Sequence, residues 1–182
     1  DGNNDGLDLE LPFFQNQQIG YSFENEFAFD FWLKSSQNVE DTYATIINFN
    51  GQGTSGYSCN RISIHINENG FLRIGLVVSG TGIGTIYSNY QVNDGNWNHI
   101  LFQRDENNSI KLFVNSVLNY ESSNGVPGIL NLTQDLNCSS VSYLKNTVGY
   151  LYNQPPSQDS QYKYEGNIDN LRVWETSFND SE

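Results

Sequence analysis

Tyrosines are the side chains of this sequence with the clearest potential for binding chemistry. Several of them lie near the ends of proposed strands or in proposed loops: Tyr87, Tyr90, Tyr150, Tyr152, Tyr162 and Tyr164. Sugars present flat C–H faces that stack on such rings, and nearby Asn, Gln and Asp side chains bond to the sugar hydroxyls. We therefore predict a ligand-binding surface that includes Tyr87, Tyr90 and Tyr152. For any single tyrosine the alternative is packing at the rim of the core.

The acidic and histidine residues do not form a recognisable catalytic motif. A glycoside hydrolase needs two carboxylates that flank the scissile bond. The nearest candidates, Glu24 and Glu26 with Asp30 further along, are interpreted as solvated charges, because the two glutamates precede the proposed strand. His65 and His99 are the two histidines of the chain and belong to different proposed strands. The sequence thus predicts a protein that is not an enzyme, with a hydrolase as the weaker alternative.

Composition limits the class of partner. The chain has 182 residues, a formal net charge of −13 and 14% aromatic residues. Its length fits one domain with a sizeable core. A surface this acidic repels a phosphate backbone, which argues against nucleic-acid binding, and it is compatible with divalent cations. No apolar stretch is long enough to span a membrane. The absence of Met, even at position 1, suggests an excised mature segment.

Two cysteines, Cys59 and Cys138, lie far apart in the sequence and outside any metal-binding motif. In a secreted protein they would most simply form one disulfide, which would stabilise the fold by roughly 4 kcal/mol in the chain-entropy model. The alternative is a pair of buried free thiols.

The elements that must position these residues show the two-residue period of β-strands. Ile62, Ile64 and Ile66 alternate with polar residues, as do Phe27, Phe29 and Phe31 with their neighbours, and both sets are expected to face the core. We predict strands at 27–34, 44–49, 61–67, 72–78, 87–92 and 147–152, with a half-buried strand at Leu7, Leu9 and Leu11. The Gly-rich residues 79–84 are predicted to form a loop. Gly and Asn turns between short strands indicate an all-β, antiparallel two-sheet sandwich.

The stretch from Gly95 to Leu118 is predicted to be a β-hairpin. Trp97 and Ile100 are expected in the core, a polar break follows at 105–108, and Ile110, Leu112 and Val114 then alternate with polar or outward residues.

These residues also carry a family resemblance. GNWNHILFQRD (95–105) and SIKLFVNSVL (109–118) resemble the central hairpin of the laminin-G-like, concanavalin A-type jelly-roll domains. EGNIDNLRVWETSFNDSE (165–182) resembles the closing strand and terminal helical turn of that family, and DGNNDGLDLELP (1–12) with FAFDFWLKS (27–35) resembles its opening strands. The resemblance implies one complete jelly-roll domain over residues 1–182, with the chain ends close together on adjacent strands. His99 matches the second His of the family's W-H-H motif, which implies packing and hydrogen bonding for this residue. One departure is Asn115-Ser116, where the family has an Asp-Gly turn.

The resemblance also implies a class of function. This fold hosts lectins, adhesion modules and hydrolases. Without a catalytic motif, the sequence favours a non-catalytic recognition module, extracellular or on the cell surface, that binds glycans. The alternatives are a structural or protein-interaction module of an adhesin or filament and, less favoured, a concanavalin-like glycoside hydrolase.

A structural calcium ion is the one cofactor that the resemblance implies. In relatives, the Asp of the closing G-x-I-D motif and the opening D-G-x-x-D loop hold calcium together. The matching ligands here are Asp5 and Asp169, followed by Asn4. Calcium accepts carboxylates, amide oxygens and backbone carbonyls from flexible loops. The alternative is turn chemistry alone, which Asp, Asn and Gly favour without any metal.

Overall fold

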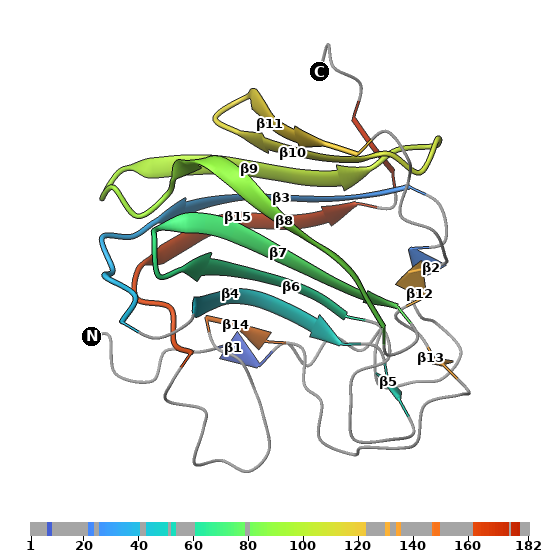
Figure 1. Ribbon diagram of the computed structural model, residues 1–182, viewed down its shortest axis with the longest axis horizontal. Helices are drawn as coiled ribbons and strands as arrows, with labels where there is room; N and C mark the ends of the chain where they lie inside the picture. The colour runs from blue at the N-terminus through green and yellow to red at the C-terminus, as the bar shows by residue number, and fades with distance from the viewer. Residues whose placement is uncertain are drawn as a thin grey trace.

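The computed structural model describes residues 26–40, 43–50, 61–78, 81–122, 147–149, 162–174 and 176–178, together with five short strand segments. Two antiparallel sheets lie face to face in it, as Figure 1 shows. None of the described residues is helical, so no helix among them could cross a membrane. The two-sheet sandwich predicted from the sequence is confirmed.

Each sheet combines strands that are distant in the sequence. The five-stranded sheet has the order β11 (Val117–Glu121), β10 (Ile110–Val114), β9 (Trp97–Arg104), β3 (Phe27–Lys34), β15 (Asn167–Trp174). The six-stranded sheet has the order β1 (Leu7–Asp8), β14 (Thr147–Val148), β4 (Tyr43–Asn50), β6 (Arg61–Asn67), β7 (Phe71–Val78), β8 (Thr81–Gln91). Two small pairs complete the described strands: β2 (Ser22–Phe23) with β12 (Leu130–Asn131), and β5 (Gln52–Gly53) with β13 (Gln134–Asp135).

The core lies between the two sheets and is built from the alternating residues that the sequence singles out. The side chains of Phe27, Phe29 and Phe31 from β3 are fully buried, and so are those of the three isoleucines of β6. The rings of Phe29 and Phe102 stack with centroids 6.3 Å apart across β3 and β9. Burying a large apolar side chain contributes roughly 1.5–3 kcal/mol, so this layer dominates the stability of the sandwich.

Trp97 does not belong to that core, which corrects the sequence prediction. Its side chain is 43% exposed, whereas Asn98 and Ile100 are buried. The reason is the period of two: Trp97 and Ile100 are three residues apart, so a regular strand turns them to opposite faces. Trp97 begins β9 on the outer face, opposite Lys34 of β3.

The opening and closing strands are not adjacent, contrary to the expectation from the resemblance. β1 pairs with β14 in the six-stranded sheet, whereas β15 pairs with β3 in the five-stranded sheet. Backbone pairing therefore assigns β1 and β15 to different layers.

The Gly-rich prediction is also corrected in part, because β8 begins at Thr81 rather than after residue 84. Gly82 pairs with Val77 and Gly84 with Leu76. Ladder hydrogen bonds use only the backbone, so glycines can extend a strand next to an established neighbour.

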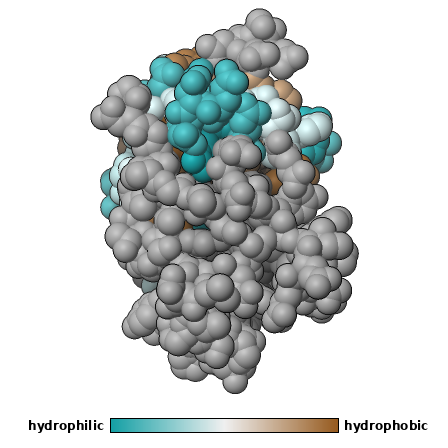
Figure 2. Space-filling model, turned by 90° about the vertical axis from the view of Figure 1, so that its right-hand side faces the viewer, coloured by the Kyte–Doolittle hydropathy of each residue, from teal (hydrophilic) through white to brown (hydrophobic). Residues whose placement is uncertain are grey.

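The central hairpin forms as predicted, and both of its turns use left-handed residues. The break at 105–108 joins β9 to β10, and Figure 2 shows a hydrophilic surface over this end of the five-stranded sheet. Asn115 and Ser116 have φ of 52° and 65°, so the turn between β10 and β11 has the two positive φ angles of a type I′ hairpin turn without any glycine. The Asn115 side chain accepts a hydrogen bond from the His99 backbone N–H at 2.9 Å. The departure from Asp-Gly thus preserves the turn.

Candidate functional site

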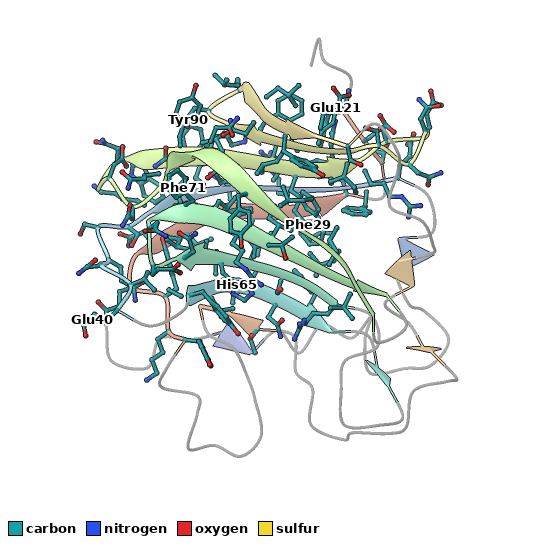
Figure 3. The ribbon with its side chains drawn as sticks, viewed as in Figure 1. Phe29, Glu40, His65, Phe71, Tyr90 and Glu121 are labelled. Atoms are coloured by element: carbon teal, nitrogen blue, oxygen red, sulfur yellow. The ribbon has the colours of Figure 1, made fainter. Side chains whose placement is uncertain are left out.

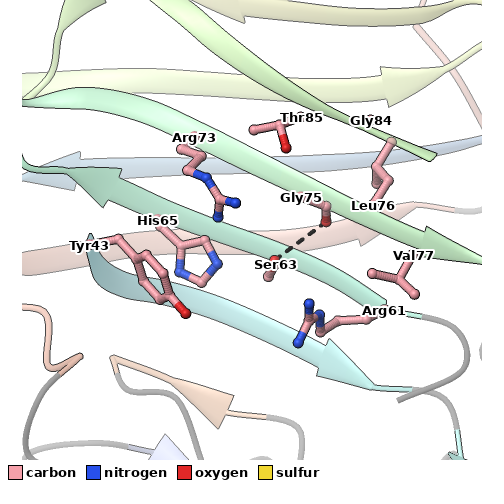
Figure 4. A pocket seen from close by; sticks show the side chains of 10 residues that line it. All are labelled: Tyr43, Arg61, Ser63, His65, Arg73, Gly75, Leu76, Val77, Gly84 and Thr85. Atoms are coloured by element: carbon pink, nitrogen blue, oxygen red, sulfur yellow. Dashed lines mark hydrogen bonds between the residues drawn. The ribbon is translucent and has the colours of Figure 1, made fainter. Parts of the chain in front are cut away.

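A hollow of ≈ 190 Å³ opens on the outer face of the six-stranded sheet. Figure 4 shows the residues that line it: Tyr43, Arg61, Ser63, His65, Arg73, Gly75, Leu76, Val77, Gly84 and Thr85. They come from β4, β6, β7 and β8 of the six-stranded sheet, and Figure 3 shows His65 on that sheet. The ten residues include no Asp or Glu.

Strand alternation places the polar residues of β6 in this hollow. Arg61, Ser63 and His65 face outward because the intervening isoleucines face the core. Strand register then joins residues of neighbouring strands into rows. Thr45, His65, Arg73 and Tyr87 form one row across four strands, because each is the register partner of the next. Ser63, Gly75 and Thr85 form the next row.

Tyr43 provides an aromatic wall. Its ring stacks on Tyr162 with centroids 4.6 Å apart and planes 17° apart, and its centroid lies 4.3 Å from that of His65. The guanidinium carbon of Arg73 lies over the same ring. Burial raises the pKa of Tyr43, as does its neighbour Tyr162. The hydroxyl therefore stays protonated at neutral pH and can donate a hydrogen bond.

His65 is a neutral residue of this wall. Its side chain is buried, and Nδ1 lies 3.1 Å from Oγ1 of Thr45. Burial, together with the positive charges of Arg73 and Arg61, lowers the pKa of His65 to about 3. At physiological pH the ring is therefore uncharged, and the positive charge of the hollow comes from its two arginines.

The two arginines have no acidic partner among the described residues. Burial lowers the pKa of Arg61 and Arg73 adds to that effect, while Tyr43 opposes it. The Arg61 Nε atom is buried without a hydrogen-bond partner, and so are both polar atoms of the Asn48 side chain. Asn48 is the register partner of Ser63. Buried polar groups in native proteins are nearly always bonded to protein or water, so the Arg61 Nε in the lining indicates a position where water or a ligand group completes the site.

Two of the three tyrosines predicted to bind a ligand are described, and neither lines the hollow. Tyr87 is 47% exposed and lies opposite Arg73 in the outer row. Tyr90 is 55% exposed and does not line the hollow. Tyr152 lies outside the described residues.

Two further tyrosines that the sequence singled out have clear roles. Tyr162 forms part of the wall because its ring stacks on Tyr43. Its carbonyl accepts a hydrogen bond from the Thr45 backbone N–H at 2.8 Å, which holds this segment beside β4. Tyr164 is structural, since its hydroxyl donates to the backbone oxygens of Lys34 and Asn167 at 3.0 and 3.1 Å.

Sequence reasoning missed Tyr43, Arg61, His65 and Arg73. The alternation at 61–67 contained the signal, because a strand with three inward isoleucines must turn Arg61, Ser63 and His65 to the other face. Interpreting that strand only as core left its polar face unused.

The acidic candidates have other roles or lie elsewhere. Asp30 is 7% exposed and is not a solvated charge. Its carboxylate lies 2.6 Å from His99 Nε2 and 2.5 Å from an Nη atom of Arg172, which confirms hydrogen bonding as the role of His99. Glu26 accepts a hydrogen bond from Thr176 Oγ1 at 3.2 Å, and Glu24 lies outside the described residues.

The calcium and disulfide residues are only partly described. Asp169 is exposed on β15, where its carboxylate accepts the Asn170 backbone N–H at 2.8 Å beside a bulge. Asn4, Asp5, Cys59 and Cys138 lie outside the described residues. Within the described part of the chain no three His, Cys, Asp or Glu side chains gather in a metal-binding group. Because the other residues of both sites lie outside the described part of the chain, the calcium ion and the disulfide stay predictions.

The chain belongs to the concanavalin A-like lectin/glucanase superfamily, whose family model matches residues 1–182. No curated protein sequence matches it.

Solved structures share the fold. The CBM40 domain of the Ruminococcus gnavus IT-sialidase bound to α2,3 sialyllactose has a TM-score of 0.64 and 17% identity, over 86% of this chain and 79% of that one. Domains LG4-5 of the mouse laminin α1 chain have a TM-score of 0.58 and 10% identity, over 97% of this chain and 40% of that one. A mutant of the NanB sialidase from Streptococcus pneumoniae has a TM-score of 0.65 and 14% identity, over 98% of this chain and 26% of that one. At these identities the likeness defines the fold.

Proposed function

We propose that this protein is a non-catalytic glycan-binding module of an extracellular or cell-surface protein, and that the glycan binds in the hollow on the six-stranded sheet. The observation that carries the proposal is the arrangement of Tyr43, Ser63 and Arg73 around a hollow on the outer face of this sheet. An aromatic wall beside hydrogen-bond donors is the combination that sugar recognition requires.

The chemistry of the lining supports binding rather than hydrolysis. Hydrolysis of a glycosidic bond requires an acid and a second carboxylate about 5–10 Å apart across the bond. The hollow has neither among its ten lining residues. The CBM40 domain with a similar fold was solved with bound sialyllactose, which is in keeping with a sugar ligand for this chain.

A glycan array tests the proposal, with and without calcium. Thr85 is exposed at the rim of the hollow, so Thr85→Trp should obstruct the hollow while leaving the core unchanged. Trp97→Ala changes an exposed aromatic residue on the other sheet and is the control. We expect binding by the parent and the control and none by Thr85→Trp. A blank array for the parent would refute the function, whereas binding lost only in Trp97→Ala would refute the site.

A protein-binding role is the second candidate, and the outer face of the five-stranded sheet favours it. Trp32 and Trp97 are 37% and 43% exposed there, and Leu118 is 45% exposed. Aromatic side chains are enriched at protein interfaces. If the array is blank, sedimentation of the parent and of a Trp32→Ser, Trp97→Ser double variant tests whether this face pairs with a second copy of the chain. Equal monomeric behaviour of both would count against self-association.

A further inference from the structure

Two arginines of one hollow, neither with an acidic partner among the described residues, indicate the charge of the group that it binds. We infer that the hollow takes a single terminal acidic sugar and holds its carboxylate or sulfate group between Arg61 and Arg73, an inference that rests on the proposed glycan-binding function. The remaining two of the four arginines have partners: Arg172 pairs with Asp30, and Arg104 donates to the Asn108 side chain.

The charge balance of the chain makes this placement significant. With 21 acidic and 8 basic residues, the chain has more carboxylates than its cations can pair with. No described carboxylate nevertheless forms an ion pair with Arg61 or Arg73, and no acidic residue lines the hollow. A partly buried cation without a counter-charge is unfavourable in the folded protein. A bound anion would remove that cost.

The geometry suits an anion between the two guanidinium groups. Figure 4 shows them on either side of Ser63, one from β6 and one from β7. Arg73 is held over the Tyr43 ring, and the buried Nε of Arg61 has no hydrogen-bond partner. Guanidinium groups bind carboxylate and sulfate oxygens through paired N–H donors.

The other polar groups of the hollow are also donors. The Ser63 hydroxyl makes only a long 3.4 Å hydrogen bond to the Gly75 carbonyl, so it can turn to a ligand. The Tyr43 hydroxyl stays protonated at neutral pH. Arginine has five N–H donors and no acceptor, so a ligand rich in acceptor oxygens matches this lining better than a cation does.

The size of the hollow limits the ligand to one sugar ring. Its ≈ 190 Å³ is below the roughly 300–1,000 Å³ typical of sites for larger ligands. Gly75 helps to keep the floor clear, because a Cβ at that position would lie 2.9 Å from Ser63 Oγ. A chain end fits this hollow better than the middle of a polysaccharide.

Calorimetric titration of the parent with lactose, sialyllactose and sulfated lactose tests the inference. We expect binding of at least one acidic probe and a loss of roughly ten- to hundredfold for lactose, the range for losing a charged hydrogen-bond partner. The two acidic probes distinguish a carboxylate from a sulfate site. Equal binding of lactose would overturn the inference while preserving the glycan-binding function.

Two variants and a control assign the effect to the arginines. Arg73→Gln should bind the acidic probe roughly ten- to hundredfold more weakly than the parent does. Lys34→Gln removes the same charge from an exposed position on the other sheet, so it should bind as the parent does. If Arg73→Gln and Lys34→Gln lose affinity for the acidic probe equally, the net charge of the protein explains the effect and the inference is overturned.

Arg61→Met separates a binding role from a structural one. Because Met fills similar space without a buried charge, this variant should melt at the same temperature as the parent or higher, yet lose the acidic probe. A lower melting temperature with binding unchanged would show that Arg61 stabilises the sheet instead, and would overturn its assignment.

Discussion

The guanidinium carbon of Arg73 lies 5.4 Å from the centroid of the Tyr43 ring, on the sheet face opposite the core. This contact joins β4 to β7 across the intervening β6, and it fixes the direction of a side chain that would otherwise sample many rotamers. The ring therefore holds the Arg73 guanidinium in place for the anion that we propose.

Removing the Tyr43 ring should weaken ligand binding more than removing its hydroxyl. A cation–π contact contributes about 0.5–2 kcal/mol, so Tyr43→Ala should lower affinity for a bound glycan by roughly two- to thirtyfold. Tyr43→Phe retains the ring face and should lose less. Calorimetry on both variants checks this, and equal losses would show that the hydroxyl matters rather than the ring.

Stability should fall on acidification because of His65. Its folded-state pKa of about 3 lies below the unfolded value near 6.5, so between these values the unfolded chain binds the extra proton. The contribution is fully present above pH 6.5 and is lost as the pH falls toward 3, on the order of 3 kcal/mol between pH 7 and pH 4. Urea unfolding of His65→Gln should show a shallower pH dependence than the parent. Parallel pH profiles would contradict this assignment.

Trp97 and Phe29 should differ sharply in their contribution to stability. Phe29→Ala removes a fully buried ring and should cost roughly 3–5 kcal/mol. Trp97→Ala changes a half-exposed position on the outer face and should cost about 1 kcal/mol or less. Chemical denaturation of the two variants provides the comparison, and a similar cost for both would place Trp97 in the core after all.

The hairpin turn offers two glycine substitutions with opposite expected signs. Ser116 has φ of 65°, and relieving that conformation with Ser116→Gly should raise stability by about 1 kcal/mol. Asn115→Gly should instead lower it by about 1 kcal/mol, because the side chain bonds to the His99 N–H and to Asn98 Oδ1 at 2.9 Å each. Thermal unfolding measures both, and shifts of the same sign would refute the account of this turn.

Calcium, if bound by Asp5, Asn4 and Asp169 as we propose, should raise the melting temperature, and a chelator should lower it. A hundredfold excess over the dissociation constant would add about 2.7 kcal/mol. Asp169→Asn is the matched variant, since an amide oxygen can still accept the Asn170 N–H while the carboxylate charge is lost. Its melting should respond less to calcium. Coincident melting of the parent in calcium and in chelator would exclude the ion.

The alternation of apolar residues by itself determined the two-layer fold, because a period of two assigns each residue of a strand to one face. It correctly placed Phe29 and Ile64 in the core, and the polar break at 105–108 correctly predicted the hairpin. Strict use of the same period would have turned Trp97 outward. These features are local, so the sequence contains them directly.

Only the tertiary structure decided which outward residues meet. Arg73 and His65 lie opposite each other because the register of β6 and β7 pairs them, and Tyr162 reaches Tyr43 through a backbone hydrogen bond to Thr45. Register depends on how all the strands pack over a shared core, and Thr45 and Tyr162 are more than a hundred residues apart. The hollow therefore follows from long-range pairing. The polar face of β6 that contributes to it follows from the alternation of the sequence alone.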